Sequence, residues 1–184
     1  MDSIVVLDFG SQTAQLIARR LREAMVYCEL FPHDAAQDSV MALQPKGFIL
    51  SGGPASVYEP NSPQIPNYVL DSGLPLLCIC YGMQALAHSL GGRVAASRAR
   101  EYGPAEIEVP NGGGLLRKGR HPVWMSHGDR IDQLPKGFQV LASSSNAPYA
   151  AMGNPELKRY GLQFHPEVQH TPDGIEILRS FAVE

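Results

Sequence analysis

Four short apolar runs in the first half of the chain constrain its fold most strongly. They are Ile4–Leu7, Val26–Phe31, Gly47–Leu50 and Leu74–Ile79. The first is apolar at every position, as in a strand that is buried on both faces of a parallel sheet. Between the first two runs, Ser11–Met25 carries apolar residues at helical spacing. A further helix is predicted after the last run, over Met83–Leu90, and it ends at two glycines. Strands that alternate with helices predict right-handed β-α-β crossovers and an α/β fold.

The second half of the chain consists mostly of predicted strands, which are separated by glycine-rich turns. These strands are Arg93–Ala96, Ala105–Val109, Val123–Ser126, Phe138–Ala142, Tyr149–Met152 and Tyr160–Phe164. A terminal helix is predicted over Asp173–Ala182. We therefore expect residues 1–184 to form a single domain. Its open mixed sheet has a parallel core, flanked by helices and extended by antiparallel strands.

Composition excludes several classes of protein. With 44% hydrophobic and 18% charged residues, the 184-residue chain is globular, not disordered. It has 15 basic and 18 acidic residues, a net charge of −3, so nothing favours binding to nucleic acid. No apolar run approaches the roughly 20 residues that span a bilayer, and no basic segment precedes the first run. We expect a cytoplasmic protein that binds neither nucleic acid nor membrane, and the scattered histidines predict no metal site.

Cys80 is the first candidate for chemistry. It stands where the apolar run Leu74–Ile79 passes directly into the next predicted helix, with Gly82 two residues later. This is the pattern of a nucleophile elbow, and the positive end of the helix dipole favours a thiolate there. A buried structural cysteine is the alternative interpretation. Cys78 lies two residues earlier within the apolar run, where we predict that it faces the same side as Cys80 and packs in the core.

His165 and Glu167 are the second candidate pair. Side chains two apart in an extended segment point the same way, and Pro166 stiffens the link between them. The carboxylate can then hold one imidazole nitrogen and leave the other facing the thiol, as in a catalytic triad. Taken alone, His165 is more simply interpreted as a surface or hydrogen-bonded histidine, and the catalytic interpretation depends on its combination with Cys80 and Glu167.

A glycine-rich segment, Ser51–Pro54, follows the third predicted strand. It lacks the Gly-Lys-Ser/Thr of a phosphate-binding loop, and no dinucleotide-binding motif follows the first strand. Its glycines permit a backbone N–H to point into the site, so Gly53 and Tyr81 could form an oxyanion hole with their N–H groups. A plain turn is the alternative.

These residues together resemble the class I, or triad-type, glutamine amidotransferases, over essentially the whole chain and in the same order. The resemblance rests on Cys80 in Cys-Tyr-Gly-Met-Gln, on His165-Pro166-Glu167 and on the Ser51–Pro54 loop. Two further strings, Leu7–Gln12 and Met125–Asp129, resemble more narrowly the glutaminase portion of GMP synthetases, as does the stretch from His165 to Thr171.

The resemblance implies a flavodoxin-like fold and a specific chemistry. Cys80 would attack the side-chain amide of L-glutamine, with His165 and Glu167 completing the triad and the Gly53 and Tyr81 amides holding the oxyanion. Glutamine would be bound by the residues Gly52, Gln84, Ser126, His127, Gly128 and Asp129. The ammonia would pass to an ATP-dependent synthetase that converts XMP to GMP.

The chain departs from that pattern in two places. Cys78 stands where the family usually has a glycine, which puts the packing beneath the elbow in question. The chain also lacks the phosphate loop of an ATP pyrophosphatase domain. We therefore predict no cofactor in this domain, with ATP and magnesium used by the partner, an XMP-aminating domain or subunit. The chain would be a stand-alone subunit or, as its start favours, an excised domain.

Two other functions stay open at this point. One is a cysteine peptidase or deglycase-like hydrolase of the same superfamily, although such enzymes usually have histidine after the nucleophile, where this chain has Tyr81. The other is a non-catalytic α/β binding module, in which Cys80 would be dispensable.

Overall fold

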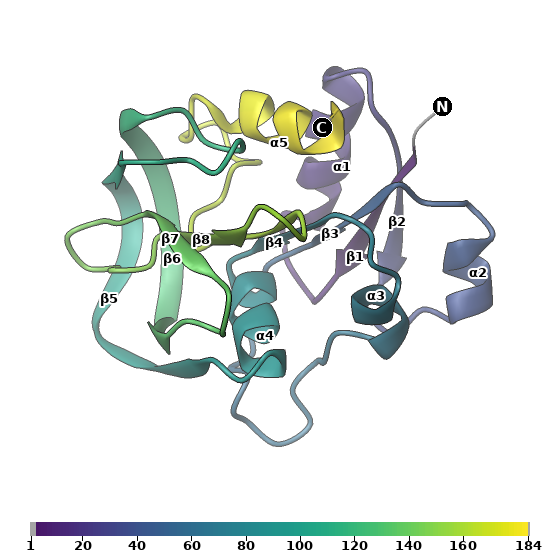
Figure 1. The fold of residues 1–184 in the computed structure, drawn as a ribbon, viewed down its shortest axis with the longest axis horizontal. Helices are drawn as coiled ribbons and strands as arrows, with labels where there is room; N and C mark the ends of the chain where they lie inside the picture. The colour runs from purple at the N-terminus through teal and green to yellow at the C-terminus, as the bar shows by residue number, and fades with distance from the viewer. Residues whose placement is uncertain (1–2, 184) are drawn as a thin grey trace.

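The computed structural model describes residues 3–183, except for the side chains of residues 98–100 (Figure 1). Its strands are β1 (Ser3–Asp8), β2 (Tyr27–Pro32), β3 (Gly47–Leu50), β4 (Leu76–Ile79), β5 (Arg93–Val109), β6 (Gly119–Gln133), β7 (Gln139–Ala142), β8 (Ala151–Asn154) and β9 (Arg159–Leu162). Its helices are α1 (Ala14–Glu23), α2 (Gln37–Met41), α3 (Asn67–Asp71), α4 (Tyr81–Ser89) and α5 (Gly174–Val183). None of these helices is long and apolar enough to cross a membrane.

The main sheet has seven strands in the order β2-β1-β3-β4-β9-β8-β7. From β2 to β9 all neighbours pair in parallel, whereas β8 and β7 extend the sheet with antiparallel pairing. This confirms the predicted mixed sheet with a parallel core. The short helix α2, which buries only Val40, was not predicted.

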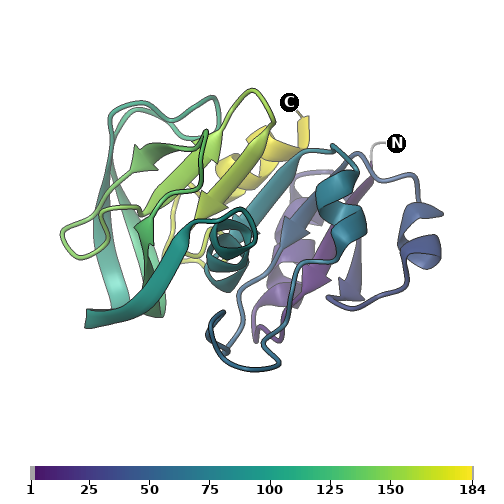
Figure 2. The same cartoon turned by 60° about the horizontal axis from the view of Figure 1, so that its bottom comes forward.

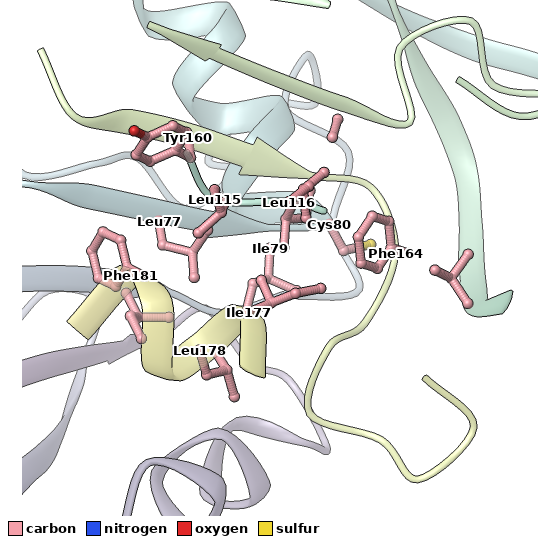
Figure 3. Close-up of a cluster of buried hydrophobic side chains, with 14 of the residues drawn as sticks. Leu77, Ile79, Cys80, Leu115, Leu116, Tyr160, Phe164, Ile177, Leu178 and Phe181 are labelled. Carbon is pink, nitrogen blue, oxygen red and sulfur yellow. The ribbon is translucent and has the colours of Figure 1, made fainter. Parts of the chain in front are cut away.

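Helices cover both faces of this sheet, so its central strands are buried on both sides. Figure 1 shows α1 and α5 on one face and α4 with α3 on the other. Side chains alternate along β4: Leu77 and Ile79 belong to the core layer that contains α1 and α5. Figure 3 shows these two side chains directed toward Ile177 and Leu178 of α5. The alternate residues of β4, Leu76 and Cys78, belong to the opposite layer.

The strands β5 and β6 form a separate two-stranded antiparallel ribbon at the flank of the molecule (Figure 2). The sequence predicted two short strands where β5 is continuous, and this was wrong. The polar segment 97–104 interrupts the apolar pattern, but the backbone pairing resumes after an irregularity between Ala96 and Glu101. Pairing with β6 therefore overrides the local sequence signal.

The ribbon is joined to the main sheet close to the predicted site. An isolated bridge pairs Met125 of β6 with Phe164, which follows β9. The His165 N–H donates a hydrogen bond of 3.0 Å to the Trp124 carbonyl. These contacts bring the segment that begins at Ser126 to the carboxyl ends of β4 and β9, where ligands bind in parallel sheets.

Candidate active site

Cys80 occupies a tight turn between β4 and α4. Its backbone has φ 51° and ψ −107°, a left-handed conformation that is strained for a residue with a side chain. The turn is held on both sides, because the Cys80 N–H donates to the Leu162 carbonyl at 2.6 Å and the Gly82 N–H donates to the Ser51 carbonyl at 3.2 Å. The predicted strand-to-helix elbow is therefore present, with Cys80 at its apex.

Cys78 and Cys80 belong to opposite core layers. Cys78 is fully buried with α4, whereas Cys80 joins the layer that contains Ile79 and Phe164 (Figure 3). The prediction that the two cysteines share a face was wrong, because the strand ends at Ile79 and the turn redirects the next side chain. Burial raises the pKa of the Cys78 thiol well above its ordinary value. Cys78 is thus a neutral packing residue, as predicted.

His165 and Glu167 lie just beyond β9 and form a close pair. The His165 Nδ1 atom lies 2.8 Å from the Glu167 Oε1 atom. Glu167 is completely buried, and Oε1 also accepts a hydrogen bond of 2.7 Å from the Thr13 hydroxyl. The backbone carbonyl of Glu167 accepts a further bond, 3.1 Å long, from Arg20 Nε. The carboxylate is therefore fixed in place and orients the imidazole.

The second imidazole nitrogen of His165, Nε2, is buried and makes no hydrogen bond within the described residues. A Cβ placed on Gly52 would lie 3.3 Å from the His165 ring and 3.5 Å from the Cys80 Cβ, so the two side chains converge there. Burial alone lowers the pKa of His165, but its interactions with the Cys80 sulfur and the Glu167 carboxylate outweigh burial and raise the pKa to about 10. At neutral pH the ring is therefore positively charged beside the sulfur.

This raised pKa predicts how stability depends on pH. The folded chain favours protonated His165, so its contribution to the free energy of unfolding is fully present below pH 6.5 and is lost as the pH rises through about 10. We expect the melting temperature of the parent chain to fall relative to that of His165→Gln between those values. Thermal unfolding followed by circular dichroism at several pH values measures this difference.

A matched control is His88→Gln, which changes an exposed histidine on α4. It should keep the pH dependence of the parent. A constant difference between the parent and His165→Gln across the whole window would contradict the predicted role of the His165 charge.

Gly53 and Tyr81, whose N–H groups are predicted to form an oxyanion hole, line the same cavity as Cys80. Tyr81 is the first residue of α4, and Gly53 follows β3. Neither N–H donates a hydrogen bond to another residue in the described part of the chain. A Cβ on Gly53 would lie 2.4 Å from the Phe9 carbonyl oxygen, so the close approach of these two segments requires glycine there. Both N–H groups are therefore unpaired within the described residues, as an oxyanion hole requires, and the oxyanion hole stays a prediction.

Two cavities meet at Cys80. One, of about 530 Å³, contains all the predicted glutamine-binding residues except Gly52, which lies between Cys80 and His165 instead. The other, of about 320 Å³, is lined by Cys80, His165, Trp124 and the segment 10–13. Both volumes suit a small ligand, and the reactive groups lie where the cavities join.

Three of the predicted binding residues are already engaged within the protein. The Gln84 Nε2 atom donates at 3.3 Å to the Asp129 backbone carbonyl. The same carbonyl lies 2.9 Å from His127 Nδ1, while His127 Nε2 lies 3.3 Å from Glu101, so both ring nitrogens are engaged within the protein. The Asp129 carboxylate accepts hydrogen bonds from Ser56 and Tyr58. Contact with a ligand at this segment would therefore come mainly through backbone groups.

Two side chains that touch the candidate triad were not predicted, Thr13 and Gln163. Thr13 contacts Glu167 across 154 positions of sequence, and only the rule that ligands gather at the carboxyl ends of parallel strands points to its segment. Gln163 lies two positions before His165 in the same extended segment, and its Nε2 atom lies 3.7 Å from the Cys80 sulfur. Side chains two apart in an extended segment point the same way, so the alternation that pairs His165 with Glu167 also predicts that Gln163 faces the same side as His165.

The chain is similar to several known proteins. Two similar relatives are both named GMP synthase [glutamine-hydrolyzing]. The one from Thermomicrobium roseum is 64% identical over 184 residues, and the one from Rhizobium johnstonii is 52% identical over 185 residues. Each match covers 98% of this chain but only 34% and 36% of the respective relative, so the chain spans about a third of their length.

Solved structures agree with the fold. A putative GMP synthase subunit from Thermoplasma acidophilum has a TM-score of 0.82 at 30% identity, covering 99% of this chain and 92% of that one. A glutamine amidotransferase from Thermotoga maritima, only 20% identical, has a TM-score of 0.79 with 98% and 96% covered, and it supports the fold alone. The model of the family "Glutamine amidotransferase class-I" matches residues 5–184. The resemblance seen in the sequence is thus confirmed, and the chain belongs to the class I glutamine amidotransferases.

Proposed function

We propose that this chain hydrolyses L-glutamine to glutamate and ammonia and supplies the ammonia to an ATP-dependent synthetase that converts XMP to GMP. The observation that carries the hydrolytic part is the convergence of His165, fixed by Glu167, on Cys80 at the elbow. The assignment to GMP formation rests on the names of the relatives and on their greater length, about two thirds of which lies outside this chain.

The first half of the reaction forms a thioester. The Cys80 thiolate attacks the side-chain amide carbon of glutamine, and the carbonyl oxygen becomes an oxyanion that the Gly53 and Tyr81 N–H groups stabilise. Protonated His165, whose pKa is raised to about 10, donates its Nε2 proton to the leaving nitrogen. The C–N bond breaks, ammonia departs, and a glutamyl thioester remains on Cys80.

The second half releases glutamate. Neutral His165 accepts a proton from a water molecule, which attacks the thioester carbon, and the same oxyanion site holds the developing charge. The C–S bond then breaks and returns Cys80 as the thiolate beside protonated His165. Glutamine and water are consumed, and glutamate and ammonia are produced.

The experiment that tests this proposal combines the chain with the synthetase portion of the Thermomicrobium roseum relative. GMP formation from XMP, ATP and magnesium is measured with glutamine or with ammonium chloride as the nitrogen source. We expect ammonium to support GMP formation without this chain, whereas glutamine supports it only when the chain is present.

A diazo-ketone analogue of glutamine adds a second readout. It should add covalently to Cys80 and abolish the glutamine-dependent rate while leaving the ammonium-dependent rate intact. An adduct on Cys28 or Cys78, or GMP formation from glutamine at the same rate with and without the chain, would refute the proposal.

A further inference from the structure

Gln163 is a buried polar side chain with a fixed position next to the reacting sulfur. It directly follows β9, is 1% exposed, and its backbone N–H donates at 2.9 Å to the Ala150 carbonyl. Its side-chain Nε2 atom lies 3.7 Å from the Cys80 sulfur, within hydrogen-bonding range of that larger acceptor. The proposed mechanism assigns no role to Gln163.

The direction of the Gln163 amide is set by a short relay of hydrogen bonds. A backbone carbonyl can only accept, so the Asp129 carbonyl requires Gln84 to present its Nε2 group, at 3.3 Å. The second hydrogen of that group donates to Gln163 Oε1, also at 3.3 Å. With its oxygen engaged by Gln84, Gln163 must turn its N–H toward the sulfur. The reverse orientation would place an oxygen beside a thiolate.

A second polar group near the Cys80 sulfur, the Ser126 carbonyl, disfavours the thiolate that an N–H donor would stabilise. The Ser126 carbonyl oxygen lies 3.5 Å from the Cys80 sulfur. An oxygen at this position accepts a hydrogen bond from the protonated thiol and repels a thiolate, whereas an N–H donor stabilises the thiolate. Cys80 is only 6% exposed, so water compensates little for the repulsion. An N–H donor on another side of the sulfur would oppose this effect of the Ser126 carbonyl.

We propose that Gln163 is this donor: its side-chain N–H, oriented through Gln84 by the Asp129 carbonyl, stabilises the Cys80 thiolate against the Ser126 carbonyl. The inference deepens the proposed function and rests on Cys80 being its nucleophile. It assigns Gln163 a role distinct from that of His165, which faces the same sulfur as a proton donor and acceptor. The predicted binding residue Gln84 acquires a second role, the orientation of Gln163.

The test compares the parent chain with Gln163→Met, which keeps the length of the side chain but removes the donor. The rate at which iodoacetamide alkylates Cys80 is measured across pH, with the adduct located by mass spectrometry. We expect the pH midpoint for Cys80 to rise by about one unit, a tenfold smaller thiolate fraction below the midpoint. In glutamine hydrolysis, kcat should fall about tenfold while KM changes less than about twofold.

The control is Gln133→Met, which makes the same exchange at an exposed position at the end of β6. It should match the parent in both assays. A lower kcat for Gln163→Met with an unchanged midpoint would reduce Gln163 to a packing role and overturn the proposal.

A second variant keeps the proposal testable if Gln163→Met does not fold. Gln163→Glu retains the shape of the side chain and can still accept from Gln84, but it turns a carboxylate oxygen toward the sulfur. It should raise the midpoint further than Gln163→Met, and an unchanged midpoint would overturn the proposal. The alkylation profiles need neither glutamine nor a synthetase. If the parent does not hydrolyse glutamine, the proposed function fails while these profiles still decide the role of Gln163.

Discussion

Replacing Cys80 by alanine should lower the rate of glutamine hydrolysis at least about 10⁴-fold, the scale seen when a triad nucleophile is removed elsewhere. The loss is large because no other thiol takes its place: Cys28 is buried in β2 and donates to the Ala18 carbonyl, and Cys78 lies in the opposite core layer. Ammonia release with the synthetase portion present measures the loss. The free energy of unfolding should fall by about 1 kcal/mol, because the variant removes one buried sulfur atom and keeps the backbone of the turn.

The matched control is Cys78→Ala, which removes a sulfur two residues away on the opposite face of the sheet. Its cavity should cost about 1 kcal/mol of unfolding free energy and leave hydrolysis close to that of the parent. GMP formation from ammonium chloride should be the same with either variant. Glutamine hydrolysis by Cys80→Ala at even a tenth of the parent rate would show that another group is the nucleophile.

The parts of the fold that could be predicted are those that a short stretch of sequence determines by itself. The buried runs at Ile4–Leu7 and Gly47–Leu50 correspond to β1 and β3, because a strand covered by helices on both faces must be apolar at every position. The ribbon β5–β6 was predicted less well. Its middle section is stabilised by pairing with a strand that lies far along the chain, and no local pattern encodes such a pairing.

In the candidate site, too, the features set by neighbouring residues could be predicted, and the contacts between distant segments could not. The turn at Cys80 follows from an apolar strand that runs into a helix, and the His165–Glu167 pair follows from side-chain alternation. Both features follow parallel strands, and the carboxyl ends of parallel strands lie at the same edge of the sheet. The Thr13 hydroxyl on Glu167 and the Gln84–Gln163 relay join segments more than 75 positions apart. Such contacts depend on how the loops pack, so their residue types alone do not predict them.

Gly174→Ala is expected to damage both the fold and the triad, although Gly174 contacts no reacting atom. This glycine begins α5, and an added Cβ would lie 1.8 Å from the Pro166 carbonyl oxygen. Pro166 cannot easily move, because the neighbouring His165 is bonded through its N–H to Trp124 and through its carbonyl to the Thr171 hydroxyl, at 3.0 and 2.7 Å. Either α5 shifts outward or the segment that carries His165 and Glu167 is displaced.

We expect this variant to lose about 3 kcal/mol or more of unfolding free energy. Its kcat should fall about 100-fold, because a displacement of about 1 Å in a catalytic group has effects of that size. Urea unfolding and glutamine hydrolysis measure the two losses. Gly73→Ala is the control: its Cβ enters open space at φ +68°, far from the triad, so it should cost about 1 kcal/mol and leave kcat unchanged. If Gly174→Ala behaved like Gly73→Ala, the triad segment would tolerate displacement, and the contact between α5 and Pro166 would not set the position of His165.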